Sequence, residues 1–597
     1  MLFMKGHGGH AIYEYSDYTR DTKRMARDAC GYRPDETYPA WDPDNLGQFG
    51  YLCDGAAGIP ANAETVGALR EIACEMIDQA PHDHDNSKIP AAFTYIGQFI
   101  DHDITAGTDR EISVSEIDVP NLKPLKQSEV ETKVANLRTG KLDLDSLYGG
   151  AVLQGSLANQ IVDEKLLRHP VWKAKLRLGI STPTGTLTVD KPDDPARDVL
   201  RLGRLIDSGT IEPDDISSLS SDLQDAFTTA PGVINRQKAV IGDGRNDENL
   251  AVSQTHLAMA RFHNICVVYG HTIGGPKDLS SEDTFNFARN LTRWTYQWLI
   301  LHDYLPRICQ QDVLASVIAD NAPMYKNFFD RVGPGDGSRL PMPLEFSVAA
   351  FRFGHTMARP DYDWNKHFGR DPGTVAPRGD FRQLFRLTGG ANPPMHVVVS
   401  PMGDIRSFPT LPDNWVVDWS RFIDESGKFP DRFTRRIDTH LAPPLLEMFN
   451  EPKGMHARMQ DLAERNLRRS YRLAIPSAQA CITKMAKHKI AITPLSHKVL
   501  RNGPGGAALE RADMLDATPL WYYILREAEV QTDGETLGQL GSRLVAETLV
   551  GLIVNDPDSF WCQAGSDGGR WHPQDSIKPK GKPVTSFERL VEASGLI

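Results

Sequence analysis

Residues 93–104 have the sequence FTYIGQFIDHDI, in which apolar side chains recur at the spacing of an α-helix. Gln98, Asp101 and His102 stand at positions i, i+3 and i+4, so they share one face of this helix. Burying an amide, a carboxylate and an imidazole together is costly unless they serve a ligand. The segment therefore predicts one wall of a binding site, with a solvated polar stripe as the alternative.

Helical periodicity continues outward from this segment, whereas strand patterns are few and short. We expect a mainly α fold, with a single large all-helical domain over residues 86–597, long loops and little β structure. Residues 1–85 are rich in turn formers, and we interpret them as an irregular N-terminal arm. The expected helices are 91–104, 248–271, 281–302, 344–356, 455–472 and 537–553, and the expected strands are 186–189 and 396–399.

The composition excludes several classes of protein. With 597 residues, 40% of them hydrophobic, and a net charge of -12, the chain has no basic footprint for nucleic acid. No apolar run approaches the roughly 18 residues of a membrane span, and the N-terminus lacks a signal-peptide core. We expect a cytoplasmic protein, or one exported without a leader. The sequence gives no oligomeric state.

The seven cysteines are scattered and form no C-x-x-C pair, which argues against a disulfide framework or a thiolate metal site. Cys30 with Cys53 is the one pairing that the N-terminal region suggests. His7, His10 and the run PHDHD at 81–85 have metal-ligand spacing, but no further ligands follow, and we interpret them as solvated loops.

Two later segments also combine polar and apolar residues in a way that suggests a site. In GDGRNDENL, residues 242–250, Arg245 stands in a turn before a helix and Glu248 in its first turn, where helix capping is the alternative role. In AAFRFGHT, residues 349–356, His355 has apolar neighbours and Gly354 lets a flat group approach, with a satisfied core histidine as the alternative.

These three segments, in this order, resemble the animal-type haem peroxidase family of the peroxidase–cyclooxygenase superfamily, which includes myeloperoxidase, lactoperoxidase and bacterial relatives. The family's motifs are GQFxDHD, R-x-x-E and FRxGH. Residues 463–477 resemble its asparagine-containing helix, and residues 519–528 and 541–561 resemble its C-terminal helices. The resemblance implies a peroxidase that reduces hydrogen peroxide and oxidises halides, thiocyanate or small organic donors.

On the distal side, the resemblance gives His102 the role of proton carrier, which suits an imidazole. Arg245 would stabilise charge on the breaking O–O bond, and Gln98 would orient water or halide. Asp101 and Glu248 resemble the two carboxylates that form ester bonds to the haem. No sulfonium link is expected, because Asn249 follows the glutamate where myeloperoxidase carries methionine.

On the proximal side, the resemblance makes His355 the axial ligand of the iron of haem b. Asn466 would accept the ring N–H of this histidine and so raise its basicity as a ligand. Arg469 would pair with a haem propionate, for which the fork of a guanidinium is well suited.

Residues 139–149, TGKLDLDSLYG, resemble the calcium loop of the same family. The resemblance makes Asp103, Thr139, the carbonyl of Lys141, Asp143 and Asp145 the ligands, all of them hard oxygen donors as Ca²⁺ prefers. Asp145 departs from myeloperoxidase, which carries serine there. An Asp-rich turn without metal is the alternative.

Three alternatives to a peroxidase remain at the sequence level. A fatty-acid dioxygenase of the same superfamily would carry a tyrosine three residues before the proximal histidine, but Arg352 stands there, and Asp101 favours the peroxidase. A non-catalytic peroxidase-like binding module would be expected to lose the catalytic residues, which are all present. A zinc hydrolase is disfavoured because the chain has no H-E-x-x-H motif.

Overall fold

The structure is a computed structural model of the chain. It describes residues 47–78, 86–106, 114–149, 164–184, 194–217, 224, 227–230, 232–335, 337–370, 378–389, 398–399, 405–406, 410–448 and 457–597. The runs around His7, His10 and 81–85, the expected strand 186–189 and Cys30 lie outside these residues. No helix among the described residues is long and apolar enough to cross a membrane.

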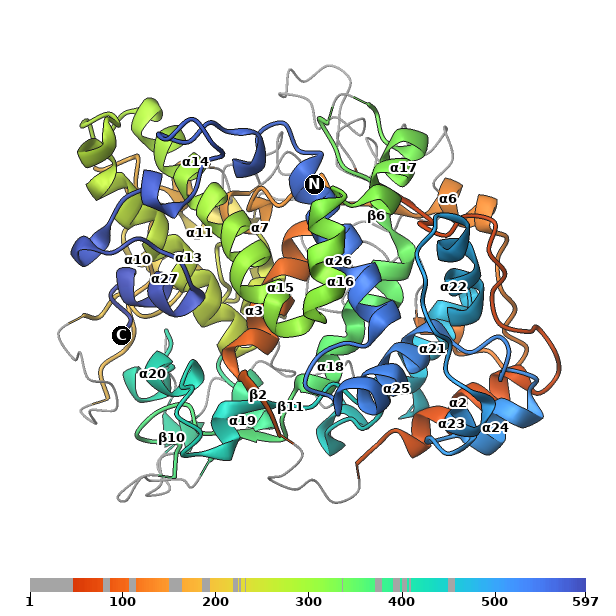
Figure 1. The fold of residues 1–597 in the computed structure, drawn as a ribbon. Helices are drawn as coiled ribbons and strands as arrows, with labels where there is room; N and C mark the ends of the chain where they lie inside the picture. Colours follow the sequence, from red (N-terminus) through yellow and green to blue (C-terminus); the bar gives the residue numbers. More distant parts are fainter. Residues whose placement is uncertain are drawn as a thin grey trace, which may run out of the picture.

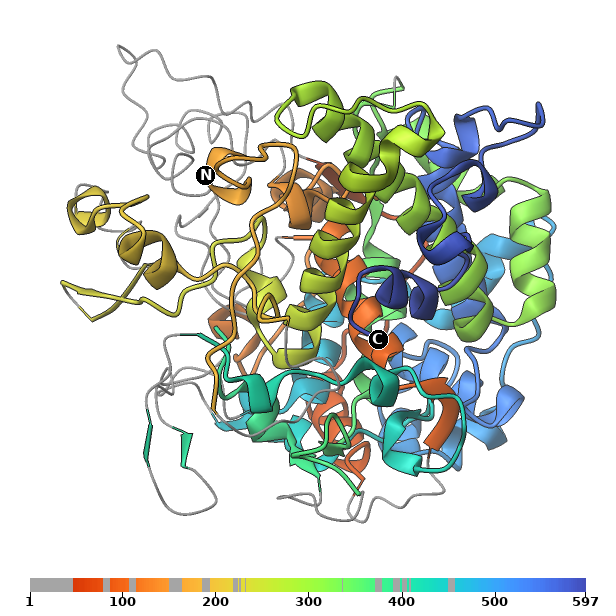
Figure 2. The same cartoon turned by 90° about the vertical axis from the view of Figure 1, so that its left-hand side faces the viewer.

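The fold is mainly α, as predicted, and helix α3 (Ala92–Ile104) runs through its middle (Figure 1). α13 (Leu250–Tyr269) packs against both α3 and α14 (Glu282–Leu299). Figure 2 shows the same arrangement of helices turned by 90°. The side chains of Asn249 and Ser281 cap α13 and α14 by accepting the backbone N–H of Val252 and Thr284. These caps explain why both helices begin slightly later than periodicity alone predicts.

The remaining α-helices surround this centre. They are α2 (Thr65–Glu75), α5 (Val114–Ile117), α6 (Gln127–Lys133), α7 (Asp145–Tyr148), α9 (Glu164–Leu167), α10 (Leu202–Asp207), α11 (Pro213–Ser217), α15 (Leu305–Ile308), α16 (Gln311–Ala319), α17 (Pro323–Val332), α18 (Gly354–Met357), α19 (Phe381–Phe385), α20 (Trp419–Phe422), α21 (Leu462–Arg472), α22 (Ala478–Lys487), α23 (His497–Arg501), α24 (Gly506–Arg511), α25 (Leu520–Thr532), α26 (Gln539–Val554) and α27 (Phe587–Ala593).

Strands are short and occur only in small sheets among the described residues. In the three-stranded sheet, β1 (Gly47–Gly50) lies between antiparallel β3 (Ala135–Asn136) and parallel β6 (Met342–Pro343). The two-stranded pairs are β2 (Asn86–Pro90) with β11 (Phe433–Arg435), β4 (Thr228–Ala230) with β5 (Val233–Ile234), β7 (Asp361–Tyr362) with β8 (Gly379–Asp380), and β9 (Val398–Val399) with β10 (Ile405–Arg406).

Two parts of the chain differ from the sequence-based expectation. Residues 47–78, expected to be irregular, contain β1 and α2, and α2 packs its apolar face on α21. The expected helix 344–356 is broken into a π-helical turn, Glu345–Ala349, a 3₁₀ turn, Ala350–Phe353, and α18. Because nearly every residue of this segment is buried, its apolar pattern carries little information about helical period.

The start of α26 depends on a buried carboxylate from α25, which lies beside it in Figure 1. Glu527 accepts the backbone N–H groups of Leu540 at 2.8 Å and Gly541 at 3.1 Å. A Cβ at Gly538 would lie 2.3 Å from the Glu527 side chain, so glycine is required there for close approach. Burial raises the pKa of Glu527 to about 7, although these two N–H groups oppose the shift.

This raised pKa predicts that Glu527 makes stability depend on pH. Between an unfolded value of 4.5 and a folded value of about 7, the folded chain binds the extra proton. The stabilisation is therefore complete at acid pH and is lost as the pH rises to about 7, at about 1.4 kcal/mol per pH unit. In urea unfolding, Glu527→Gln should gain stability relative to wild type from pH 5 to 8. The exposed Glu588→Gln is the control, and a parallel pH dependence in all three proteins would contradict the assignment.

Candidate functional site

The side chains of Gln98 and Asp101 on α3 form one wall of a large cavity. Gln98 is fixed at both ends of its amide, because Nε2 donates to Glu248 Oε2 at 2.9 Å and Oε1 accepts from Asn249 Nδ2 at 2.9 Å. Glu248 and Asn249 also line the cavity. The structure thus brings together Gln98, Asp101 and Glu248, as the sequence motifs predict.

His102 is fully buried on α3, and its ring orientation is set by Asn246. The Nδ1 atom of His102 lies 2.9 Å from Asn246 Oδ1, while Asn246 Nδ2 lies 3.2 Å from Nδ1 of His256. Burial lowers the pKa of His256 to about 4, so this ring is neutral near pH 7 and its Nδ1 can accept from the amide. The amide oxygen then faces His102, whose Nδ1 donates and whose Nε2 is the proton-accepting nitrogen.

Arg245 is placed differently from the expectation that its side chain faces the cavity. Its guanidinium donates to both carboxylate oxygens of Asp243 and to the backbone carbonyls of His102, at 2.8 Å, and Thr105, at 2.9 Å. Neither Arg245 nor His102 is among the residues that line the cavity. The arginine therefore braces the C-terminal end of α3, where backbone carbonyls have no helical partner.

Asp243 holds a second buried arginine. Its carboxylate also accepts a hydrogen bond from Arg138, on the loop that follows β3. Burial alone would raise the pKa of Asp243, but Arg245 and Arg138 outweigh it and hold the pKa well below its usual range. Asp243 also caps the 3₁₀ turn Gly244–Asp247, and Asn249 caps α13. The helix-capping role that the sequence left open for Glu248 therefore belongs to these two residues.

His355 lines the cavity from α18. Its Nδ1 lies 2.9 Å from Asn466 Nδ2 on α21, and Asn466 Oδ1 accepts from Arg352 at 2.9 Å. The motifs predict this pairing of His355 with Asn466, but they predict that Asn466 accepts the hydrogen bond from the ring. Here Asn466 presents its amide nitrogen to the ring, because the guanidinium of Arg352 engages its oxygen.

The cavity has a volume of about 1140 Å³, counted to its open mouth. Aromatic and aliphatic side chains make up much of its wall, and the polar part includes three arginines, two carboxylates and one histidine. The apolar lining residues include Tyr304, Phe351, Met357, Phe381, Leu384, Phe385, Leu445, Met448 and Leu462, and the arginines are Arg352, Arg465 and Arg469. A flat apolar molecule with acidic substituents would match this lining.

The loop at 139–145 lies against the end of α3. Asp103, Asp143 and Asp145 are called here the loop carboxylates; the first and last are buried and Asp143 is half-buried. Burial raises the pKa of Asp103 to about 8 and that of Asp145 to about 6. Repulsion by Asp143 raises the pKa of Asp103 further, whereas the positive charge of Arg138 lowers the pKa of Asp145. Thr139 donates to Asp143 at 3.0 Å. Oδ2 of Asp145 is buried without a hydrogen-bond partner.

The loop is also tied to the C-terminal part of the chain, because Nζ of Lys141 lies 2.7 Å from the buried carboxylate of Asp556. Within the described ranges, no three His, Cys, Asp or Glu side chains are arranged as the ligands of a metal ion. The calcium site therefore stays a prediction, as does the metal role of each loop residue.

Sequence analysis missed the orienting roles of Asn246 and His256 and the presence of Arg465 in the cavity wall. Arg465 and Arg469 stand four residues apart, so the helical face that carries Arg469 could have indicated the second arginine. No sequence signal links Asn246 to a histidine ten residues later on another helix.

Residues 197–388 match the family model described as animal haem peroxidase. The matched span contains Arg245, Glu248 and His355, and it leaves out α3 and Asn466.

Individual relatives are distant. The chain is 29% identical over 121 residues to a dual oxidase of Drosophila melanogaster, and 23% identical over 280 residues to a peroxidase-like protein of Margaritifera margaritifera. These matches cover 20% and 47% of the chain but only 7% and 33% of the two relatives. Peroxidase A from Dictyostelium discoideum aligns over 86% of this chain and 88% of its own, with a TM-score of 0.47 and 15% identity.

The two arginines held by Asp243 predict an unusually large effect of one substitution. Asp243→Asn would leave two buried guanidiniums facing each other, and breaking a buried ion pair costs about 3–5 kcal/mol. Asp207→Asn is the matched control, because Asp207 pairs with Arg236 at the surface and such pairs contribute at most about 1 kcal/mol. Denaturant unfolding of the three proteins measures both values. Equal small losses in the two variants would show that Asp243 does not hold the end of α3.

Proposed function

The chain carries an animal haem peroxidase domain over residues 197–388, and on that premise we propose that it is a peroxidase that reduces hydrogen peroxide and oxidises halides, thiocyanate or small organic donors. One observation carries the proposal: His355 with Asn466 and the polar face of α3 meet at one apolar, arginine-containing cavity. This is the arrangement that a ligated, flat, dianionic cofactor requires.

The residues present fit haem b. The macrocycle is flat and apolar, which suits the aromatic and aliphatic walls, and its two propionates suit Arg469 and the neighbouring Arg465 and Arg352. His355 would hold the iron. Ligation through Nε2 leaves the ring proton on Nδ1, so Asn466 would then have to present its oxygen to the ring. When bound, the haem supplies the redox chemistry with peroxide.

Asp101 and Glu248 both line the cavity, where we propose that they form ester bonds to the haem. Two such bonds would hold the cofactor against oxidative loss. Asn249 has no sulfur and donates to Gln98, so no third link is expected at that position.

The proton transfers fall to His102 in this proposal. Its Nε2 would take a proton from one peroxide oxygen and return it to the other, while Asn246 keeps Nδ1 as the donor to the protein. Gln98 would orient water or anion at the cavity wall. Arg245 would act as a positioning residue, because its guanidinium is engaged by Asp243 and by the carbonyl of His102 itself.

A calcium ion at the loop carboxylates is part of the same proposal. These carboxylates lie close enough together for Asp143 to raise the pKa of Asp103 and for Asp145 to raise that of Asp143, so they repel one another when ionised. A divalent cation would neutralise them, and Thr139 and the carbonyl of Lys141 would add hard oxygen donors. Because Asp103 follows His102 directly, the ion would hold the proton carrier in place.

Histidine substitutions test the proposed peroxidase. His355→Ala should lose the Soret band of the ligated haem, and His102→Ala should keep the band but lose about 10²–10⁴-fold in turnover with peroxide and a dye donor. His302→Ala, on the surface beside Trp298, is the control for both readouts. Denaturing chromatography of the same samples shows whether haem stays on the polypeptide, and Asp101→Val should release part of it. Full activity in His355→Ala would refute the assignment.

Metal analysis tests the calcium site. After exhaustive buffer exchange the chain should retain one calcium, and Asp143→Ala should lose it together with several degrees of melting temperature, because a ligand of the folded state stabilises it. The control Asp558→Ala removes an exposed carboxylate beside Lys141. This variant should keep both the calcium and the melting temperature of the wild type. An Asp143→Ala protein with unchanged calcium and melting temperature would exclude the site.

A further inference from the structure

Two buried cysteines from distant parts of the chain meet in the core. Cys53 follows β1, and Cys481 lies in α22; both side chains are fully buried. Both are free thiols in this structure, and the neighbouring Cys53 thiol raises the pKa of Cys481. Neither has an assigned role in the proposed peroxidase.

Backbone contacts on both sides of the two thiols hold them together. Nζ of Lys484 donates to the carbonyl of Asp54 at 3.0 Å, although the two residues are 430 positions apart. The backbone N–H of Ser477 donates to the carbonyl of Ala57 at 2.9 Å. Ser477, Cys481 and Lys484 are spaced by four and three residues, so they lie along one face of α22. That face is the one that packs on residues 53–57.

The opposite side of the N-terminal segment is fixed as well. Glu345 accepts the backbone N–H groups of Leu52 and Cys53, each at 2.9 Å, and the hydroxyl of Tyr51 donates to the carbonyl of Leu473 at 2.6 Å. The positions of both cysteines are thus set by contacts that do not involve sulfur.

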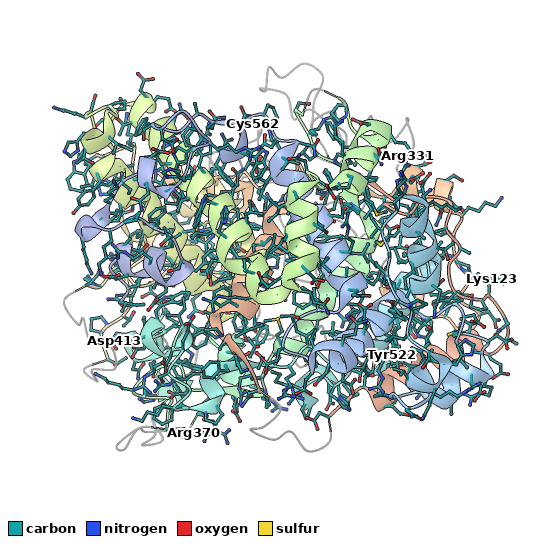
Figure 3. All side chains as sticks on the ribbon, viewed as in Figure 1. Lys123, Arg331, Arg370, Asp413, Tyr522 and Cys562 are labelled. Carbon is teal, nitrogen blue, oxygen red and sulfur yellow. The ribbon has the colours of Figure 1, made fainter. Side chains whose placement is uncertain are left out.

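The other cysteines of the described chain are placed differently. Cys266 and Cys309 are buried, and the Cys309 thiol points to the carbonyl of Ser542 at 3.8 Å. Cys74 and Cys562 are exposed, and Figure 3 shows Cys562 near the edge of the molecule. Among the described residues, Cys53 and Cys481 are thus the pair that the fold brings together.

We propose that Cys53 and Cys481 form a disulfide when the chain folds in the presence of a disulfide oxidant. One thiolate attacks the oxidant and releases one thiol; the second cysteine attacks the mixed disulfide and releases the other. Two protein thiols are oxidised, one oxidant disulfide is reduced, and two protons are lost from the protein. The bond would join the segment after β1 to α22 and close the residues between 53 and 481 into one loop.

The surroundings of the two thiols indicate at which stage of folding the disulfide forms. The hydrogen bond to Cys53, burial and the charge of Glu345 together raise the pKa of Cys481 well above its ordinary value. Because the thiolate is the reactive form, the reduced pair reacts slowly once the core has closed. The bond therefore forms during folding, before Cys481 is buried.

Refolding of the full chain tests the proposal without reference to haem. The reduced, denatured protein is refolded either with oxidised and reduced glutathione or with excess reductant, alkylated in denaturant, and digested without reduction for mass spectrometry. The glutathione sample should contain the Cys53–Cys481 cross-linked peptide, with Cys74 and Cys562 alkylated, and the reductant sample should not. Recovery of both cysteines as alkylated residues, or a link from Cys53 to Cys30, would overturn the proposal.

Variants separate the disulfide from other effects of oxidation. Oxidised wild type and Cys309→Ala should both melt several degrees above their reduced forms, because the cross-link restricts the unfolded chain. Cys481→Ala and the smaller change Cys481→Ser should show no such difference. An equal difference in all four proteins would assign the stabilisation to another bond and refute the pair.

Discussion

The buried carboxylate of Asp243 is the charge on which the proposed distal side depends. On one side it binds Arg138, which reaches toward the loop carboxylates, and on the other it binds Arg245, which holds the last carbonyls of α3. The loop, the 3₁₀ turn and the helix are therefore held by one anion. The turn that begins at Asp243 ends at Glu248 and Asn249, which hold both ends of the Gln98 amide. The turn thus positions both the end of α3 and the amide of Gln98.

The opposite wall of the cavity is built on irregular backbone. His355 follows a π-helical and a 3₁₀ turn, and π-helical turns are frequent at functional sites because they re-aim side chains. The long helix α21 then supplies Asn466, Arg465 and Arg469 on neighbouring turns. The partner of the histidine and the two cavity arginines thus lie on a regular helix, whereas His355 itself lies on the short helix α18.

The sequence predicts features that depend on local patterns and motifs, but not those that depend on contacts between distant segments. Periodicity predicts α3 and α13, and the resemblance carried by the motifs predicts that Gln98, Asp101, Glu248 and His355 meet at one cavity. The orientation of Arg245 could not be predicted, because it depends on competition between the cavity and Asp243. The contact of Cys53 with Cys481 was also beyond reach, because cysteine spacing contains no information about packing between segments so far apart.

The ion pair between Lys141 and Asp556 has a consequence for biosynthesis. A ribosome makes the loop at 139–145 long before it makes the carboxylate that receives the Lys141 side chain. The same holds for the contact of Ser594 with the carbonyl of Ala258 in α13. The contacts of this loop and of α13 are therefore completed only after Asp556 and Ser594 have been made. A nascent chain stalled before residue 556 should therefore lack the ion pair that ties this loop to the rest of the fold.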